Sequence, residues 1–287
     1  MYEIIKKYQK DAALRAGFNA LAETTFGLNF EGWYQNGFWG DNYTPYSIVM
    51  DGKIVANVSV NRTDMVIGGQ RRRLYQLGTV MTDPEYRNRG LIRAIMDEVE
   101  KDTADGDGVY LFANDSVLDF YPKFGFRQAE EFLYAKDVEQ TGDCTMERVP
   151  MNGPEGWNRL RAAIDASTFR SGCEMVSNPG LIFFYVSQFM QESVWYSGEL
   201  DAWVIADLEK GELFIHNVFC AHEIALDAVI AAFGRAVRRV VLGFAPADAA
   251  GYEMLPLKEE DTTFFVKGAV FEEFRQKKLR IPDLSHA

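Results

Sequence analysis

The sequence predicts an α/β protein built from two mixed β-sheets in tandem, each flanked by helices. Three observations support this prediction. The chain has 287 residues, which is long enough for two domains of ordinary size. Apolar residues alternate along it between strand-like and helix-like periodicities. The order hairpin, helix, strand, strand occurs twice, although no residue-level repeat accompanies it.

The first half contains the elements of one such unit. Apolar periodicity and turn residues predict a helix at 11–26, an ordered aromatic and glycine-rich loop at 30–43, and a hairpin with strands at 46–50 and 54–60. A strand at 74–81 and a helix after Pro84 are expected next. They are followed by a strand at 109–113, a helical piece ending at 124, and a strand at 131–135 that closes the sheet.

The second half repeats this order after a linker at 141–150. The same criteria predict helices at 157–164 and 180–191, a hairpin with strands at 202–207 and 212–219, a helix at 223–235, a strand at 239–244, and a strand at 263–266 that closes the second sheet. We therefore expect a first domain at 1–142 and a second, degenerate one at 143–287.

Composition excludes several classes of function. The formal charge of −12 argues against affinity for nucleic acid or anionic lipid, because both are polyanions, and it is compatible with a cationic substrate. No apolar stretch reaches the length of a membrane span. Three widely spaced cysteines form no CxxC pair, so we expect neither a disulfide framework nor a zinc site, and a cytoplasmic location.

The three histidines are expected to be structural. His216 lies in an alternating strand, His222 at a helix start, and His286 close to a loose chain end. None has a second histidine at the helical spacing of a metal site, so no metal is expected. The second half offers a surface through which a homo-oligomer could assemble.

The most informative segment is 83–93, where a strand leads through an arginine-rich turn into a helix. The first amides of a helix lack intrahelical acceptors, and together with the helix dipole they form an anion site. Gly90 lets the backbone approach a phosphate closely, and the flanking arginines add charged donors. The segment lacks the GxxxxGK[ST] pattern of nucleotide hydrolases.

This segment resembles the signature [RQ]-x-x-G-x-[GA] of the GNAT (GCN5-related N-acetyltransferase) superfamily. Arg87-Asn88-Arg89-Gly90-Leu91 fits, whereas Ile92 stands where the family usually has Gly or Ala. Its side chain either narrows the cradle or points into the core, as its spacing with Ile95 and Met96 suggests. The variant is similar to the Eis-like branch, which has a catalytic GNAT domain, a degenerate one, and a sterol-carrier-like domain for which this chain is too short.

A second block strengthens the resemblance. Many GNAT enzymes have an Asn after the next strand and a Tyr seven residues later, in the pattern N…Y-x-x-x-G-F. Asn114 and Tyr121 have that separation, and Gly125-Phe126 completes the pattern. The resemblance covers about 79–126.

The resemblance implies a fold of tandem GNAT-like sheets, with acetyl-CoA as co-substrate and direct transfer to an amine in a ternary complex. Tyr121 would protonate the departing thiolate as general acid. The backbone of Val80-Met81-Thr82 would hydrogen-bond the pantetheine arm as an added strand, and the amides of 88–92 would hold the pyrophosphate. The implied cofactor-binding residues are Val80, Met81, Thr82, Arg87, Asn88, Arg89, Gly90, Leu91, Ile92, Arg93, Asn114 and Ser116.

The acceptor site is less defined. Trp33, Trp39 and Tyr43 either line an amine site, since aromatic faces attract cations, or form a lid or core. The family has no fixed general base. The candidates are Glu23, which we also place in substrate binding, Glu31, Asp41, the C-terminal carboxylate of Ala287, and a water chain.

These features predict an acetyl-CoA-dependent N-acetyltransferase that acts on a small cationic amine. The alternatives are a catalytically silent CoA-binding regulatory module, an acyltransferase acting on a protein amine or with a longer acyl chain, and a structural partner that binds no CoA. Cys220-Ala221-His222 replaces the arginine-rich turn in the second half. That half is therefore expected not to bind CoA but to cover the first sheet and shape the acceptor pocket.

Overall fold

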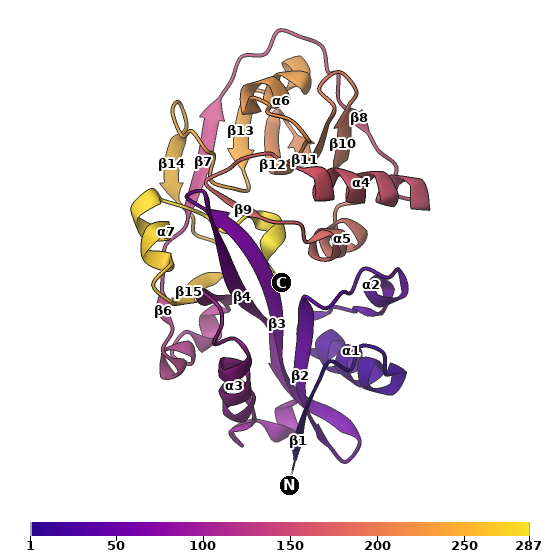
Figure 1. Cartoon of the computed structure of the whole chain (residues 1–287), viewed down its shortest axis with the longest axis vertical. Helices are drawn as coiled ribbons and strands as arrows, with labels where there is room; N and C mark the ends of the chain where they lie inside the picture. The colour runs from indigo at the N-terminus through magenta and orange to yellow at the C-terminus, as the bar shows by residue number, and fades with distance from the viewer. Residues whose placement is uncertain (1, 287) are drawn as a thin grey trace.

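The computed structural model describes residues 2–286 and contains two mixed sheets, one above the other in Figure 1. The larger sheet has the order β1-β2-β3-β4-β5-β15-β6, with β9 paired to β3, and the smaller has the order β14-β7-β13-β12-β11-β10-β8. Each sheet contains one parallel pair, β4–β5 or β12–β13. The predicted fold class is confirmed.

The strands of the first sheet are β1 (Glu3–Lys6), β2 (Tyr43–Met50), β3 (Lys53–Ile67), β4 (Gln70–Thr82), β5 (Gly108–Ala113), β6 (Arg127–Gln128), β9 (Cys173–Met175) and β15 (Thr263–Lys267). Those of the second are β7 (Phe132–Asp137), β8 (Glu147–Arg148), β10 (Val194–Ser197), β11 (Ala202–Glu209), β12 (Glu212–Phe219), β13 (Arg239–Leu242) and β14 (Glu253–Pro256). The helices are α1 (Ala12–Phe26), α2 (Glu31–Gln35), α3 (Leu91–Asp102), α4 (Pro154–Ala166), α5 (Pro179–Gln188), α6 (Leu226–Ala232) and α7 (Phe271–Lys277). Short 3₁₀ turns are η1 (Pro84–Tyr86), η2 (Asp115–Val117), η3 (Tyr121–Phe124), η4 (Gly234–Ala236) and η5 (Asp283–Ser285).

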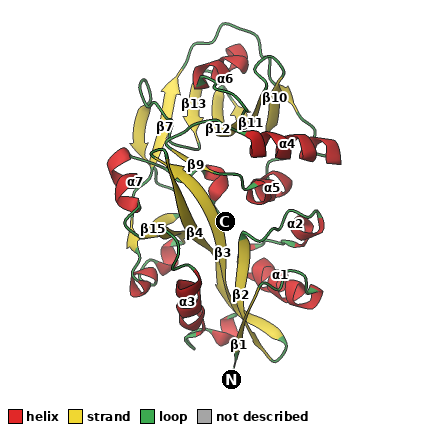
Figure 2. Cartoon of the chain, viewed as in Figure 1, coloured by secondary structure: helices red, strands yellow, loops and turns green. Residues whose placement is uncertain are grey.

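Local chemistry fixes the first elements where the sequence predicts them. Asp11 caps α1 by accepting hydrogen bonds from the amides of Ala13 and Leu14. Gly27 ends the helix in the left-handed conformation. Asp51 and Gly52 both have positive φ, which suits a tight hairpin between β2 and β3. Helices α1 and α3 lie on opposite sides of the first sheet (Figure 2).

The two sheets exchange their closing strands, which corrects two sequence predictions. The strand predicted at 131–135 was expected to close the first sheet, but β7 pairs with β13 and β14 in the second. The strand predicted at 263–266 was expected to close the second sheet, but β15 pairs with β5 and β6 in the first. Both are short apolar strands, and their partners are chosen by non-local pairing that local periodicity does not encode.

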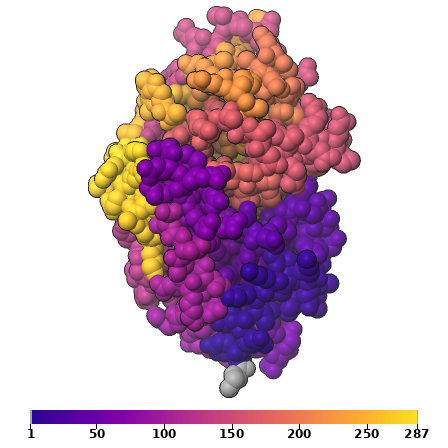
Figure 3. All heavy atoms as spheres, in the orientation of Figure 1, coloured from indigo at the N-terminus to yellow at the C-terminus, as the bar shows by residue number. Residues whose placement is uncertain are grey.

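The exchange affects the division of the chain. Neither sheet is confined to one side of residue 142, because β7 comes before it and β15 after it. The assignment of separate roles to 1–142 and 143–287 stays a prediction. Figure 3 shows the C-terminal residues, in yellow, packed beside the purple β3–β4 hairpin of the first half.

A shared core joins the two halves. Trp33 and Phe30 from the first half and Phe184 and Phe219 from the second belong to one buried cluster. The rings of Phe30 and Phe184 stack with centroids 5.2 Å apart. Helix α5 therefore packs directly on the α1–α2 region of the first half.

The histidines have mainly structural contacts. His216 on β12 lies between two carboxylates, with Nε2 2.9 Å from Asp207 and Nδ1 2.5 Å from Asp283. The expectation of a loose end at His286 is wrong. Its ring stacks on Phe112 at 3.9 Å, and its carbonyl accepts a hydrogen bond from the Tyr185 hydroxyl. The last described residues therefore lie between the two sheets (Figure 1).

Candidate active site

The site begins where two parallel strands separate. Residues Leu74–Leu77 of β4 pair with residues Gly108–Leu111 of β5, and β4 continues beyond this pairing to Thr82. Within the described chain, no strand pairs with β4 on this side beyond Leu77. The free edge includes the predicted pantetheine-binding residues Val80, Met81 and Thr82, and its backbone groups are placed to bind an extended ligand.

A β-bulge deforms β4 at this point. Ser59 of β3 faces Gly78 and Asn57 faces Met81, so Thr79 and Val80 together stand opposite Val58. Thr79 has φ of +41°, an uncommon value for a β-branched residue. Bulges re-aim backbone groups and are common next to active sites.

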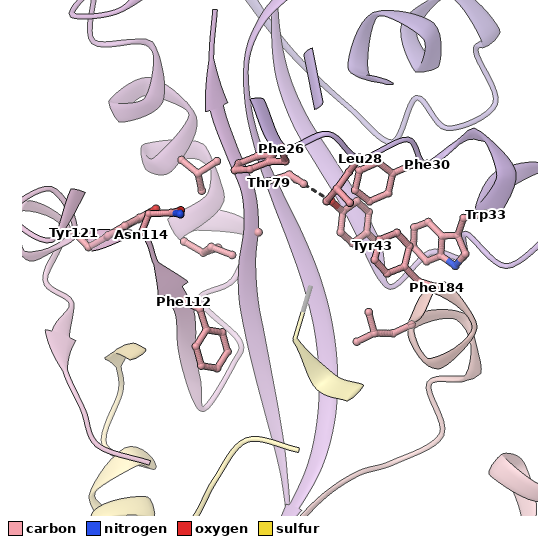
Figure 4. Close-up of a pocket in the computed structure, with 14 residues that line it drawn as sticks. Phe26, Leu28, Phe30, Trp33, Tyr43, Thr79, Phe112, Asn114, Tyr121 and Phe184 are labelled. Atoms are coloured by element: carbon pink, nitrogen blue, oxygen red, sulfur yellow. Dashed lines mark hydrogen bonds between the residues drawn. The ribbon is translucent and has the colours of Figure 1, made fainter. Parts of the chain in front are cut away.

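Buried polar side chains hold the bulge in place. The Asn57 amide donates to the Thr79 carbonyl at 2.9 Å, and the Thr79 hydroxyl donates to Ser59 at 2.6 Å. Tyr43 reaches the same Thr79 hydroxyl at 2.8 Å, drawn as a dashed line in Figure 4. Sequence reasoning missed Asn57, Ser59 and Thr79. Polar residues at inward positions of β3 were the available signal.

The loop between β4 and α3 has the geometry of an anion cradle. Asn88 and Gly90 have φ of +61° and +75°, and α3 begins at Leu91 with no side-chain cap. The first helical amides therefore remain available as donors. A Cβ on Gly90 would meet nothing within 4 Å, so it would project into the open space before the helix.

The arginines of this loop are exposed and partly pre-positioned. Arg89 donates to the Glu85 carbonyl at 2.8 Å and lies over the Tyr86 ring at 4.8 Å. Arg93 lies 5.2 Å from the centre of the Phe124 ring, and Arg87 is exposed.

Ile92, the residue that departs from the family motif, is in contact with the hydrophobic core. Leu91 is buried, and Ile92 is half-buried against the same cluster as Ile95 and Met96. Of the two interpretations of Ile92, packing against the core is the one that the structure favours.

Asn114 and Tyr121 lie together on the other side of the strand gap. Both line one pocket with Gly78, Thr79 and Val80. Tyr121 is buried, its ring lies 5.7 Å from that of Phe265 on β15, and burial raises its pKa to about 12. The phenol is therefore a proton donor at neutral pH. Ser116 is exposed on η2 and is not among the residues lining this pocket.

The remaining pocket wall is aromatic and aliphatic. It consists of Phe26, Leu28, Phe30, Trp33, Tyr43, Leu77, Phe112, Leu181 and Phe184. Leu181 and Phe184 come from α5, so the second half supplies part of the wall. Figure 4 shows Phe30, Trp33, Tyr43 and Phe184 grouped on one side of β4, with Asn114 and Tyr121 on the other.

The residues predicted for substrate binding are only partly brought together. Trp33 and Tyr43 line the pocket, and Trp39 lies behind them, with its ring 5.3 Å from Trp33. Glu23 is exposed on α1 beside Asn29 and is outside the residues lining the pocket. Trp33 and Tyr43 are also core residues, so the pocket is hollowed into the core itself.

The candidate bases also lie outside the pocket lining. Glu31 forms two 3.0 Å hydrogen bonds with Arg15, which hold the pKa of this carboxyl below its usual value. Asp41 is exposed. Ala287 lies outside the described residues.

Comparison with known proteins finds the same family that the sequence motifs resemble. Residues 16–129 match the family of acetyltransferase (GNAT) domains. No curated protein sequence gives a match. No helix within residues 2–286 combines the length and apolar character needed to cross a bilayer, and within them no three His, Cys, Asp or Glu side chains group as metal ligands.

Solved structures share the two-sheet fold at low identity. A probable N-acyltransferase from Enterococcus faecalis V583 is 18% identical with a TM-score of 0.60, and the match covers 96% of this chain and 75% of that one. Eis1 from Mycobacterium abscessus is 13% identical with a TM-score of 0.57, over 92% and 73% of the two chains. A GCN5-related N-acetyltransferase from Kribbella flavida is 17% identical with a TM-score of 0.57, over 93% and 70%.

The motif, the separated parallel strands and the family match agree. Residues 16–129 are similar to the acetyltransferase domains of the GNAT family, and the two-sheet fold that contains them is similar to that of Eis1.

Proposed function

We propose that the chain transfers the acetyl group of acetyl-CoA to the primary amine of a small acceptor, which is cationic in solution. One observation carries the proposal. A free edge of β4 runs from the open amides of α3 to a pocket that contains Tyr121. This path suits a molecule with a diphosphate at one end, an extended arm, and a reacting group at the other end.

The coenzyme supplies an activated acyl group, and the residues of the chain orient it. The backbone amides of residues 88–92 would hold the diphosphate, with Arg87 and Arg89 beside them. The backbone groups of Val80, Met81 and Thr82 would pair with the arm. Asn114 lines the pocket beside the reacting end.

The transfer is a direct attack. The amine nitrogen forms a bond to the thioester carbonyl carbon, the carbon–sulfur bond breaks, and the Tyr121 hydroxyl gives its proton to the leaving sulfur. The acceptor ammonium first gives one proton to solvent, so that the neutral amine attacks, and the attacking nitrogen loses a second proton to water after the bond has formed. The phenolate then regains a proton from solvent, so Tyr121 returns to its starting form.

The alternatives make different predictions. A silent regulatory module binds CoA without releasing thiol, a protein acyltransferase modifies peptides rather than small amines, and a structural partner binds no CoA. The bulge at Thr79 and the buried Tyr121 favour catalysis, because a strained strand and a desolvated acid are unnecessary for binding alone.

Two measurements test the proposal on the intact chain. Calorimetry with CoA should show saturable binding, and a thiol-release assay with acetyl-CoA and a panel of amines should show turnover. CoA binding without thiol release from any small amine or peptide would leave the regulatory module, and no binding of CoA would refute the cradle.

A further inference from the structure

The pocket wall points to a class of acceptor. Building on the proposed function, we propose that the acceptor is a monoamine with an aromatic or alkyl skeleton, and that polyamines and amino sugars with several charges are poor acceptors. The inference rests on the arrangement of the pocket, in which an apolar and largely aromatic wall faces the polar end that contains Asn114 and Tyr121.

The wall of the pocket offers no ionic partner for a second positive charge. Among the described residues, no Asp, Glu, Lys, Arg or His lines the pocket. Its polar side chains are Thr79, Asn114, Tyr121, Tyr43 and the indole of Trp33. A second ammonium or a set of sugar hydroxyls would lose its water there, and aromatic faces with a few neutral polar groups would compensate only part of that cost.

The polar atoms of the aromatic wall are already used. The Trp33 indole donates to the Gly180 carbonyl at 2.8 Å, and the Tyr43 hydroxyl bonds to Thr79 at 2.8 Å. These bonds fix the rings, so an incoming molecule meets apolar faces and edges. A preformed apolar surface binds hydrocarbon without a large ordering cost.

The two acidic side chains of the α1–α2 region that were considered as bases do not line the pocket. Glu31 is engaged by Arg15 and Gln35, and Glu23 is exposed beside Asn29. The chain carries a formal charge of −12, yet no acidic side chain is among the described residues that line the pocket. The acidic composition therefore gives no argument for a polycationic acceptor.

The wall lies on the acceptor side of β4. Figure 4 shows Phe30, Trp33 and Phe184 across β4 from Tyr121 and Asn114. The α3 amides and Tyr121 mark the path of the coenzyme, so the aromatic group faces the molecule that arrives from the opposite side. The apolar occupant is therefore the skeleton of the amine and not a longer acyl chain.

The same wall assists the chemistry. An apolar surface disfavours the charged form of a bound amine and lowers its pKa. An acceptor nitrogen that enters as the neutral amine is ready to attack without a carboxylate base. This explains how the site works although no carboxylate lines it among the described residues.

The first experiment compares acceptors at fixed acetyl-CoA. The monoamine acceptors are butylamine, hexylamine and phenethylamine. From butylamine to hexylamine, kcat/KM should rise by about fourfold per added methylene, which corresponds to ~0.8 kcal/mol per buried methylene. These amines should exceed 1,5-diaminopentane, spermidine and kanamycin by at least about tenfold. The proposal is overturned if the polycations are the better acceptors.

A second arm distinguishes the acceptor from the acyl chain. With phenethylamine held constant, hexanoyl-CoA should be used less well than acetyl-CoA. A strong preference for hexanoyl-CoA with no dependence on the amine skeleton would assign the wall to the acyl group and overturn the proposal.

Variants at the pocket mouth test the mechanism of selection. Phe26 lines the pocket and is 41% exposed, so Phe26→Glu places a carboxylate at the mouth with little risk to folding. It should raise the ratio of diaminopentane to hexylamine kcat/KM by about tenfold. The matched control is Tyr2→Glu, because Tyr2 is also an aromatic residue that is 41% exposed, and it does not line the pocket. An equal change in both variants would overturn the pocket assignment.

A binding measurement separates this inference from the proposed function. Isothermal titration of the CoA-bound chain with phenethylamine and diaminopentane reports on the wall without turnover. Tighter binding of phenethylamine with no thiol release would refute transfer but support the wall. Equal or weaker binding of phenethylamine would overturn the acceptor class even if transfer occurs.

Discussion

At the scale of single residues, the acid and the anion cradle can be tested separately. Tyr121 lines the pocket in which the proposed function places the reacting end, and Gly90 is at the start of α3. A change at one should therefore affect the chemical step, and a change at the other should affect coenzyme affinity.

Tyr121→Phe should lower kcat by about 100-fold, because it removes a general acid. The Kd for CoA should stay within about twofold, since the ring remains. Burial raises the pKa of Tyr121 to about 12, so the acid form persists until the pH approaches that value. The wild-type rate should accordingly show no alkaline loss from this group below about pH 10. Stopped-flow thiol release checks the rate, with Tyr134→Phe as a control away from the pocket; an unchanged kcat in the Tyr121 variant would remove its role.

Gly90→Val should weaken CoA binding by more than about tenfold. Its φ of +75° disfavours a side chain, and the added atoms would project into the open space before α3. Gly52→Val is the matched control, because Gly52 has φ of +77° and equally open surroundings in the β2–β3 hairpin. Both variants should lose about 1 kcal/mol of stability from backbone strain. Calorimetry should find CoA affinity reduced only in the Gly90 variant, and equal losses would argue against the cradle.

At the scale of elements, His216 joins the β11–β12 hairpin to the C-terminal segment. Burial lowers its pKa, but the hydrogen bonds that its ring donates to Asp207 and Asp283 outweigh burial and raise the pKa overall. The pKa of Asp207 is lowered by His216, and that of Asp283 is lowered by His216 against its burial. The charged histidine between two carboxylates is the stabilising arrangement.

This arrangement predicts a pH window of stability. The raised histidine pKa contributes stability that is present below about pH 6.5 and is lost as the pH rises through the folded-state value. The lowered carboxyl pKa values contribute stability above about pH 4 that is lost on further acidification. Thermal unfolding of wild type should therefore show Tm falling as the pH rises from 6 to 9. In His216→Gln this fall should be much smaller, and a parallel fall in both proteins would contradict the network.

At the scale of the whole molecule, strand exchange makes each sheet depend on both halves. A fragment of residues 1–142 lacks β15, so β5 would lose its antiparallel partner and the core would lose Phe265. It also lacks α5 and its share of the pocket wall. Exposed strand edges favour aggregation.

The 1–142 fragment should therefore fail to fold by itself. We expect it to be aggregated, or to lack a cooperative transition in circular dichroism, and co-expression with 143–287 should restore a CoA-binding complex. A monomeric fragment with a sharp thermal transition and intact CoA affinity would show that the first half is an independent domain after all.

The sequence by itself determined the elements whose causes are local. Asp11 and Gly27 set the ends of α1, Asp51-Gly52 set the hairpin, and Asn88 and Gly90 set the loop that opens α3. Each depends on the chemistry of a few neighbouring residues. The GNAT motif belongs to this group, and so do the predicted positions of Asn114 and Tyr121, because their spacing is fixed along one strand and its following turn.

The tertiary structure decided what depends on distant partners. Neither the exchange of β7 and β15 nor the aromatic wall shared with α5 is encoded by periodicity, because strand pairing and packing join residues far apart in the chain. The position of Glu23 outside the pocket was settled in the same way. Helical periodicity indicates which face of a helix a residue occupies. What packs against that face is known only from the folded structure.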